Sequence, residues 1–219
     1  MSPDHDHQVR RNRGRMVDVD KQRGDKRERI LDGALKAFAK KGFYNTKVSE
    51  IAAESGVADG TIYLYFENKD DLLISLFEDR MEWIINRLES ELASVEGDAV
   101  DKLRHMFKIH CRLAVEKPDL AEFITVELRQ SAKFVKEYEN PKFGDYLKIL
   151  HGLIEDGQKS GQVREDIDVR LVSRACFGAL DEVLLQLTLS GAEADEVDQQ
   201  ADQIAAMLIE GLLVDRARR

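Results

Sequence analysis

The residues best suited to a defined chemistry lie between positions 46 and 69, which read TKVSEIAAESGVADGTIYLYFENK. Small, hydroxyl and aromatic residues are concentrated in the second half of this segment. Hydroxyl groups bind DNA phosphates, aromatic rings contact base edges, and small residues let a helix N-terminus approach a phosphate. The chain has no Ser/His/Asp set, G-x-S-x-G elbow or metal-ligand spacing. The sequence therefore predicts a DNA-reading site rather than an enzyme or a metal site.

Two short helices joined by a glycine turn have to position these residues. Apolar spacing predicts a first helix over 25–41, followed by helices over 48–55 and 59–66. Thr46 is expected to cap the second helix, and Gly56 supplies the left-handed turn after it. A helix-turn-helix places its second helix in the major groove while the first braces it. The buried face is expected to comprise Ile51, Ala52, Val57, Ile62 and Phe66.

The exposed face of this motif carries the candidate DNA contacts. We assign Thr61 and Tyr65 to phosphate and Tyr63 to a base edge or thymine methyl group. Lys69 is assigned to backbone phosphate. A small helical core is the alternative role for the aromatic residues, but residues 64–66 of one helix cannot all face the same core. The complete predicted set is Thr46, Lys47, Ser49, Ala58, Gly60, Thr61, Tyr63, Tyr65 and Lys69.

The charge distribution explains how an acidic chain can carry such a motif. The net charge is −9, yet residues 1–47 contain 13 Lys/Arg and 7 Asp/Glu, which gives +6 and leaves −15 for the rest. Phosphate contact is therefore expected only near the N-terminal end.

The chain as a whole is predicted to be all-α, with about nine helices. The remaining helices are expected at 68–93, 99–116, 119–138, 142–159, 168–189 and 195–215. We predict a mobile basic arm over 1–23, a helix-turn-helix domain over 24–84 with its motif at 47–66, and a ligand-binding and dimerisation domain over 85–219. The two cysteines lack C-x-x-C spacing, and the chain has no 18-residue uncharged run and no secretory signal. These features favour a cytoplasmic protein with no membrane partner.

Residues 46–72, with the preceding ILDGALKAFAKKGF, resemble the TetR family of bacterial transcription regulators. The family pattern is a Thr, then I-A-x-x-x-G-V, then G-T-x-Y-x-Y-F-x-x-K-x-x-L. Ala58 departs from it, because a serine is common there. The resemblance implies a homodimer in which each subunit reads half of a pseudo-palindromic double-stranded DNA operator.

The acidic body is expected to supply dimerisation and a small-molecule pocket. The dimer stripes are expected to be Phe177, Leu180, Leu184 and Leu187 on one helix and Ile204, Met207, Leu208 and Leu212 on the next. The alternative is that these stripes face the core of their own subunit. The helix over 119–138 is expected to carry two polar residues between two aromatic ones on a single face, namely Phe123, Glu127, Gln130 and Phe134. If Glu127 and Gln130 are buried, their hydrogen-bond partners would have to come from a ligand headgroup, neighbouring helices or water. His110 is expected to be a satisfied core histidine.

Several body motifs resemble the TetR-type fatty-acid degradation regulators, often called FadR. These motifs are VELRQS at 126–131, GDYLKIL at 144–150, GQKSGQVREDIDVRL at 157–171 and FGALDE at 177–182. The resemblance implies a repressor of fatty-acid degradation genes whose effector is a long-chain acyl-CoA, with no cofactor.

Such a ligand needs an apolar tunnel and cations for its phosphates. The predicted ligand-binding set is Met106, Phe107, His110, Phe123, Glu127, Arg129, Gln130, Lys133, Leu147, Leu150, Arg174, Phe177 and Leu184, with Lys148 as a further phosphate partner. The alternatives are a sensor of another hydrophobic molecule, such as a drug or an aromatic compound, and an acyl-CoA-processing enzyme.

Overall fold

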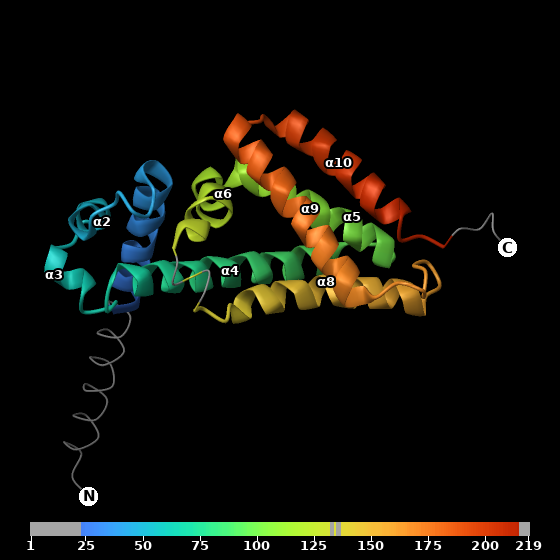
Figure 1. The fold of residues 1–219 in the computed structure, drawn as a ribbon, viewed down its shortest axis with the longest axis horizontal. Coiled ribbons are helices and arrows are strands. Elements are labelled where there is room, and N and C mark those ends of the chain that lie inside the picture. Colours follow the sequence, from blue (N-terminus) through green and yellow to red (C-terminus); the bar gives the residue numbers. More distant parts are fainter. Residues whose placement is uncertain (1–22, 132–133, 135–136, 215–219) are drawn as a thin grey trace, which may run out of the picture. The chain divides into compact units, whose positions relative to one another are not determined.

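The fold is shown in Figure 1 as a computed structural model that describes residues 23–131, 134 and 137–214, apart from the side chains of Arg129 and Gln130. Every regular element in these residues is helical, and strand-type pairing is limited to one isolated bridge between Val163 and Leu213. The prediction of an all-α chain is confirmed.

The helices follow the predicted order along the chain. They are a helix over 23–41, α2 (Val48–Ser55), α3 (Asp59–Ile62), α4 (Lys69–Ser94), α5 (Ala99–Glu116), α6 (Pro118–Thr125), the 3-10 helix η1 (Glu127–Gln130), α8 (Pro141–Lys159), α9 (Val169–Ser190) and α10 (Ala194–Glu210). With the helix at 23–41, nine α-helices lie in the described residues, as expected.

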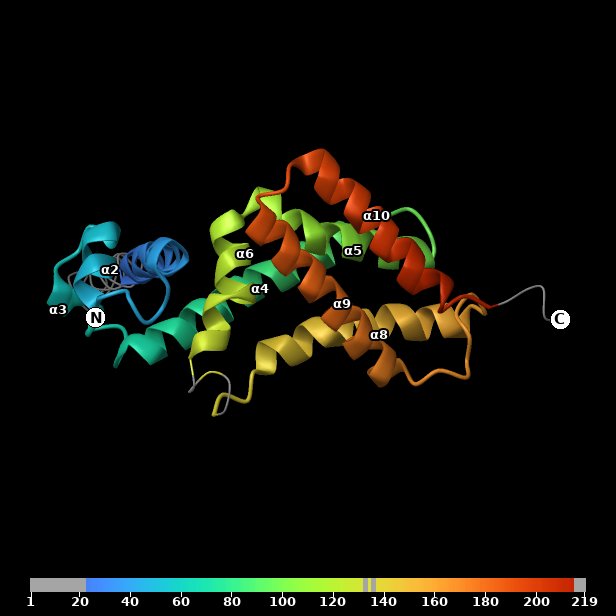
Figure 2. The same cartoon turned by 45° about the horizontal axis from the view of Figure 1, so that its top comes forward.

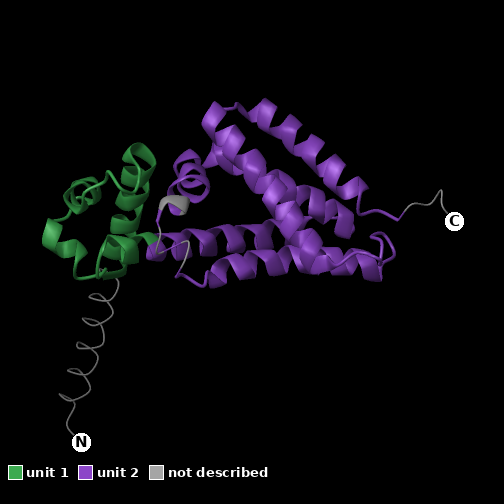
Figure 3. Ribbon diagram, viewed as in Figure 1, with its two compact units in different colours: residues 1–73 green, residues 74–219 purple. Residues whose placement is uncertain are grey.

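Two compact units divide the chain between Leu73 and Ile74 (Figure 3). The boundary falls inside α4, so this one helix belongs to both units. The predicted arm over 1–23 lies outside the described residues except for Arg23.

The first unit is built on the helix at 23–41, whose apolar residues are fully buried at helical spacing. Ile30, Leu31, Ala34 and Phe38 are each 0% exposed. Gly33 lies against α2, because a Cβ atom at Gly33 would be 2.2 Å from the Ser55 Oγ atom. The absence of a side chain therefore permits the close approach of the two helices.

In the second unit, α5 is the central helix. It contacts α6, α8, α9 and α10, and Figures 1 and 2 show α9 crossing α8 while α10 runs alongside α5. The apolar stripe of α5 accounts for this position, because Leu103, Met106 and Phe107 are each 0% exposed.

Two helices end earlier than the sequence predicts. The helix expected over 59–66 ends at Ile62 and continues as a tight turn, with the Leu64 and Tyr65 amides donating to carbonyl groups three residues back. The helix expected over 119–138 ends at Thr125, and η1 follows it. Residues 124–126 are all β-branched, which disfavours helix and explains the break. The predicted shared face of residues 123–134 is therefore wrong.

Candidate nucleic-acid interface and ligand cavity

A glycine turn and an arginine fix the geometry of the helix-turn-helix. Gly56 ends α2 with φ +63°, a left-handed conformation that a side chain resists. The Arg29 guanidinium donates from Nη2 to the Ser55 and Gly56 carbonyl oxygens at 2.9 and 3.1 Å. Carbonyl groups at the C-terminus of α2 thus gain a cationic partner, which holds the turn before α3.

The residues around α3 present an accessible surface. Ala58 and Gly60 are exposed, and a Cβ at Gly60 would meet no atom within 4 Å. Tyr63 is 57% exposed because α3 ends at Ile62, which points this ring away from the core. Thr61 and Tyr65 are partly exposed.

Basic residues of the first helix lie against the aromatic residues after α3. The Arg23 guanidinium carbon is 5.9 Å from the centre of the Tyr65 ring, and that of Arg27 is 5.5 Å from the Phe66 ring. These cation–π contacts place positive charge next to the candidate phosphate contact at Tyr65. Phe66 itself is 2% exposed and belongs to the core, in agreement with its sequence assignment.

The structure contradicts the role assigned to Thr46. Its side chain is 2% exposed, and its hydroxyl group donates to the Gly42 carbonyl oxygen at 2.8 Å, with Ala37 O at 3.1 Å. Thr46 therefore ties the segment before α2 to the end of the first helix and is covered from DNA. The N-terminal residue flanking α2 is Lys47, whose amide donates to the Glu50 carboxylate at 2.9 Å.

Lys69 is also occupied within the protein. Its ammonium donates to the carbonyl oxygens of Phe43 at 2.7 Å and Thr46 at 3.1 Å, and lies 4.5 Å from the centre of the Phe43 ring. These bonds favour a role for Lys69 in anchoring the first residue of α4 over the predicted contact with a DNA phosphate, which stays a prediction.

Sequence reasoning missed two exposed apolar or aromatic side chains in this unit. Tyr44 is 61% exposed and Leu64 is 73% exposed. Phe43 and Tyr44 are adjacent residues of one turn, yet Phe43 is only 3% exposed, so burial separates these two rings where the sequence pattern does not.

The second unit contains a cavity of about 240 Å³. From α4 its wall includes Phe77, Met81, Trp83, Ile84, Arg87 and Leu88. From α5 come Ile109, His110 and Leu113, and the remaining wall is formed by Ile124, Leu128, Phe134, Asn140, Phe143, Tyr146, Phe177 and Asp181. An apolar and aromatic wall with a few polar groups is typical of small-molecule sites.

Of the predicted ligand-binding residues, His110 and Phe177 line this cavity. Seven others are buried elsewhere and are not part of its wall, namely Met106, Phe107, Phe123, Glu127, Leu147, Leu150 and Leu184. Arg174 is exposed and does not line the cavity, and Lys148 pairs with Asp145 at 2.8 Å. Lys133 and the side chains of Arg129 and Gln130 lie outside the described residues.

The physical reason for these misses is the choice of helix face. The strongly apolar stripe of α5 packs into the core, whereas the cavity faces the neighbouring residues Ile109, His110 and Leu113. The sequence also predicts no ligand contact on the helix over 68–93, although α4 supplies six residues of the cavity wall.

His110 and Tyr146 form a polar pair within the cavity wall. Nδ1 of His110 lies 2.9 Å from the Tyr146 hydroxyl oxygen. Burial lowers the pKa of His110 to about 4, so the imidazole is neutral at physiological pH. Burial, with Cys111 and Asp181 nearby, raises the pKa of Tyr146, so the phenol keeps its proton.

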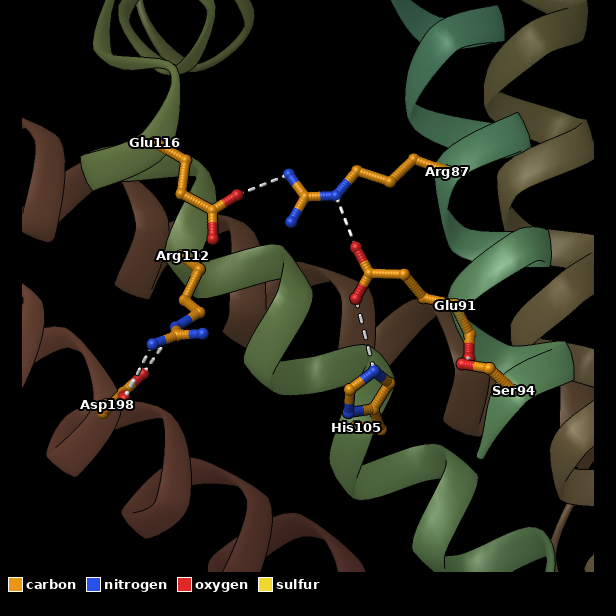
Figure 4. Close-up of polar contacts among 7 residues, drawn as sticks. All are labelled: Arg87, Glu91, Ser94, His105, Arg112, Glu116 and Asp198. Atoms are coloured by element: carbon orange, nitrogen blue, oxygen red, sulfur yellow. Dashed lines mark hydrogen bonds and ion pairs between the residues drawn. The ribbon is translucent and has the colours of Figure 1, made fainter. Parts of the chain in front are cut away.

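A network of charged groups adjoins the cavity at Arg87 (Figure 4). Its guanidinium bonds the carboxylates of Glu91 and Glu116, each at 2.6 Å, and His105 lies 3.3 Å from Glu91. Burial lowers the pKa of Arg87, but the bonds to Glu116 and Glu91 outweigh it and raise the value. This network joins α4 to α5.

A second contact in Figure 4 joins α5 to α10. Arg112 donates to both carboxylate oxygens of Asp198, at 2.8 and 3.1 Å. Such a two-bond arrangement fixes orientation as well as distance.

The two predicted dimer stripes differ in how far the single subunit buries them. Leu180, Leu184 and Leu187 of α9 are at most 1% exposed, so this stripe faces the core of its own subunit, and its assignment to a dimer interface is wrong. On α10, Met207 remains 63% exposed, and on α9, Leu189 is also 63% exposed.

Each of the two units matches a known protein family or family region. Residues 30–76 match the family described as bacterial regulatory proteins, tetR family, and residues 77–211 match the YsiA-like protein, C-terminal region. The chain belongs to the TetR family. It is a transcription regulator rather than an enzyme, as the sequence predicts.

Relatives of this TetR-family protein include regulators of fatty-acid metabolism. It is 36% identical over 192 residues to the fatty acid metabolism regulator protein of Bacillus subtilis, covering 88% of this chain and 98% of the relative. The crystal structure of the transcriptional regulator FadR from B. subtilis, in complex with stearoyl-CoA, aligns with TM-score 0.77 at 35% identity, over 84% and 98% of the two chains. FadR from Bacillus halodurans aligns with TM-score 0.78 at 33% identity, over 85% and 96%.

Two further properties concern the described residues alone. None of their helices is long and apolar enough to span a membrane. Among the same residues, no three His, Cys, Asp or Glu side chains are grouped so that they could hold a metal ion.

Proposed function

We propose that this TetR-family regulator is a homodimeric repressor of fatty-acid degradation genes that leaves its operator when a long-chain acyl-CoA fills the cavity of the second unit. The observation that carries the proposal is the apolar cavity lined by α4 and α5. The similarity to a fatty acid metabolism regulator, and to a FadR structure that holds stearoyl-CoA, supports this ligand class.

The operator contacts are proposed on the exposed surface around α3. Lys47 and Ser49 at the start of α2 are exposed and are assigned to phosphate. The remaining proposed contacts are Ala58, Gly60, Thr61, Tyr63 and Tyr65. Tyr63 is assigned to the bases, because its ring is 57% exposed, whereas Tyr65 is only partly exposed.

The cavity has to enlarge to take a long acyl chain. Its 240 Å³ is below the range of about 300–1,000 Å³ that is usual for ligand pockets. Edge-to-face ring pairs close it, with centroids 4.9 Å apart for Phe77 and Phe134 and 4.6 Å apart for Phe143 and Phe177. An acyl chain that enters between these rings would push against α4, the helix that starts at Lys69 in the DNA-reading unit.

The rim of the cavity at Trp83 is suited to the phosphates of a coenzyme A group. Trp83 lines the cavity and is 36% exposed. Lys117 is exposed, and its Nζ lies 5.6 Å from the centre of this ring. The Arg87 guanidinium, at 5.7 Å, is already bonded to Glu91 and Glu116. An exposed cation such as Lys117 can bind phosphate while the acyl chain lies in the apolar interior.

Dimerisation is assigned to the outer faces of α9 and α10. Leu189 of α9 and Met207 of α10, each 63% exposed, leave apolar surface uncovered in the single subunit. Paired with the same helices of a second copy, this surface would form an isologous interface.

A cavity-filling variant tests the proposal. Leu113→Trp places a larger side chain in the cavity, whereas Val115→Trp adds the same ring to α5 at a position that is 37% exposed and outside the cavity wall. We expect both variants to bind the operator in a fluorescence-anisotropy assay. Micromolar palmitoyl-CoA should release Val115→Trp and the parent, while Leu113→Trp should need at least about tenfold more ligand, since overpacking would have to be relieved first.

Coenzyme A alone and a non-ionic detergent serve as controls. Equal release of both variants by palmitoyl-CoA would contradict the cavity as the effector site. Release by an unrelated drug or aromatic compound, with no response to acyl-CoA, would favour the second candidate, a TetR-type sensor of another hydrophobic molecule.

A further inference from the structure

One polar atom in the cavity wall has no hydrogen-bond partner among the described residues. It is Nε2 of His110, which is buried while the opposite ring nitrogen, Nδ1, lies 2.9 Å from the Tyr146 hydroxyl oxygen. The rings of His110, Tyr146 and Phe177 contact one another, and the Phe177 ring stands edge-on to His110 at a centroid distance of 6.1 Å. A buried polar atom without a partner destabilises a protein, so its presence in the wall of a ligand cavity calls for a functional explanation.

The Tyr146 hydroxyl group determines which nitrogen of His110 carries the proton. A neutral imidazole has one N–H donor and one acceptor nitrogen. If Nδ1 carried the hydrogen and donated to Tyr146, the buried phenolic proton would need a second acceptor, and the His110 nitrogen is the one hydrogen-bond partner of this hydroxyl group found in the described residues. The pair is satisfied when Tyr146 donates to Nδ1. This arrangement leaves the hydrogen on Nε2, as a donor without an acceptor.

The charges of His110 and its neighbours determine which kind of acceptor atom suits the Nε2 hydrogen. His110 stays neutral at physiological pH because burial lowers its pKa to about 4. The Asp181 carboxylate also lines the cavity and disfavours a second negative charge beside it. A neutral oxygen atom is therefore the better partner for the Nε2 hydrogen than a carboxylate.

We propose that His110 is the group that recognises the effector's carbonyl, donating its Nε2 hydrogen to the thioester oxygen of a bound acyl-CoA, with Tyr146 as the positioning residue that fixes this tautomer. The inference rests on the proposed function and adds a specificity-determining contact to it. In the closed cavity Nε2 is covered, so the bond forms when the aromatic side chains separate around the acyl chain. A free fatty acid offers a carboxylate instead of a neutral carbonyl and is disfavoured at the same place.

The test compares palmitoyl-CoA with S-hexadecyl-CoA, a thioether that lacks only the carbonyl oxygen. Binding is followed by the fluorescence of Trp83, the single tryptophan of the chain, which lines the cavity. The parent should bind the thioester about two- to tenfold more tightly than the thioether, as expected for one net hydrogen bond. His110→Leu should bind both compounds equally, and Tyr146→Phe should reduce the difference because Nδ1 loses its donor.

Phe177→Leu is the matched control, since it changes the cavity wall next to His110 without removing a polar group. It should weaken both ligands and keep the preference for the thioester. A readout that does not depend on variant folding is the ¹⁵N NMR spectrum of histidine-labelled parent protein. Nε2 of His110 should carry the hydrogen, and its resonance should shift with the thioester but not with the thioether.

The possible results separate this inference from the proposed function. Equal binding of both compounds by the parent would overturn the role of His110 while leaving an acyl-CoA effector intact. A preference that survives in His110→Leu would also overturn it, because another group would then bind the carbonyl. If neither compound bound the parent, the proposed function would fail and this contact with it.

Discussion

Replacing Gly33 with alanine is expected to force the first helix away from α2 and weaken operator binding. A Cβ atom at this position would lie 2.2 Å from Ser55 Oγ, 3.0 Å from Ser55 N and 3.1 Å from Ser55 Cβ. Ser55 is 6% exposed, and its hydroxyl group donates to the Ile51 carbonyl oxygen at 2.7 Å. The side chain can rotate away from the new methyl group only by giving up this bond, and the backbone nitrogen cannot rotate away at all.

The balance of energies favours destabilisation. Alanine is better than glycine inside a helix by about 1 kcal/mol. Loss of the Ser55 hydrogen bond removes about 1 kcal/mol, and inserting a methyl group into a packed contact costs about 1–3 kcal/mol. The net loss for Gly33→Ala is therefore about 1–3 kcal/mol, with the contact term larger than the propensity gain.

Gly24→Ala provides the matched control because it lies in the same helix and its Cβ would meet no atom within 4 Å. Urea unfolding followed by circular dichroism, together with operator binding by fluorescence anisotropy, measures both consequences. Gly24→Ala should be as stable as the parent or slightly more so, whereas Gly33→Ala should unfold at lower urea and bind the operator less tightly. Equal stability of the two variants would refute the close approach at Gly33.

Three further predictions concern the DNA-reading unit and the cavity. Tyr63→Ala should reduce the preference for the operator sequence by about 1–3 kcal/mol. Its urea midpoint should change little, because the ring is 57% exposed. An unchanged preference across operator variants would show that Tyr63 does not contact the bases. Lys69→Met should lower the urea midpoint, as the carbonyl groups it binds lose their partner, and should leave the salt slope of DNA binding unaltered; a slope reduced by about one would restore a phosphate contact. Burial lowers the pKa of His110 in the folded protein to about 4, against about 6.5 for an ordinary histidine. Stability should therefore be intact above pH 6.5 and should fall by up to about 3 kcal/mol as the pH drops from 6.5 to 4, because the unfolded chain binds the proton first. In His110→Phe this part of the pH dependence should vanish, and an unchanged profile in urea unfolding would count against it.

The helix-turn-helix could be predicted from the sequence because local rules determine it. Gly56 ends α2 in a left-handed conformation, as expected, and Ile51, Ala52 and Ile62 are buried at the positions that the apolar spacing indicates. The sequence does not predict the contacts of a polar side chain whose partner is distant along the chain. Lys69 finds the carbonyl group of Phe43, 26 residues earlier, and no periodicity reports such a contact.

The cavity could be predicted only in part for a related physical reason. Apolar spacing identifies which face of a helix avoids water but does not distinguish a packed core from the wall of a cavity. Met106 and His110 lie on neighbouring parts of α5, yet one is core and the other lines the cavity. The break at Thr125 was also missed, because the β-branched residues that cause it fit a helical pattern of apolar positions.

The bonds of Lys69 to the segment before α2 give α4 a physical means of affecting the DNA-reading motif. Lys69 is the first residue of α4, and its ammonium is bonded to carbonyl groups in the segment that leads directly into α2. Further along the same helix, residues 77 to 88 contribute to the cavity wall. A displacement of α4 by a bound ligand would therefore pull on the residues that start α2 rather than on a free helix end. Because a packed unit responds to such a shift by moving as a body or repacking, this anchor accounts for how an effector in the second unit could change the presentation of Tyr63 to DNA.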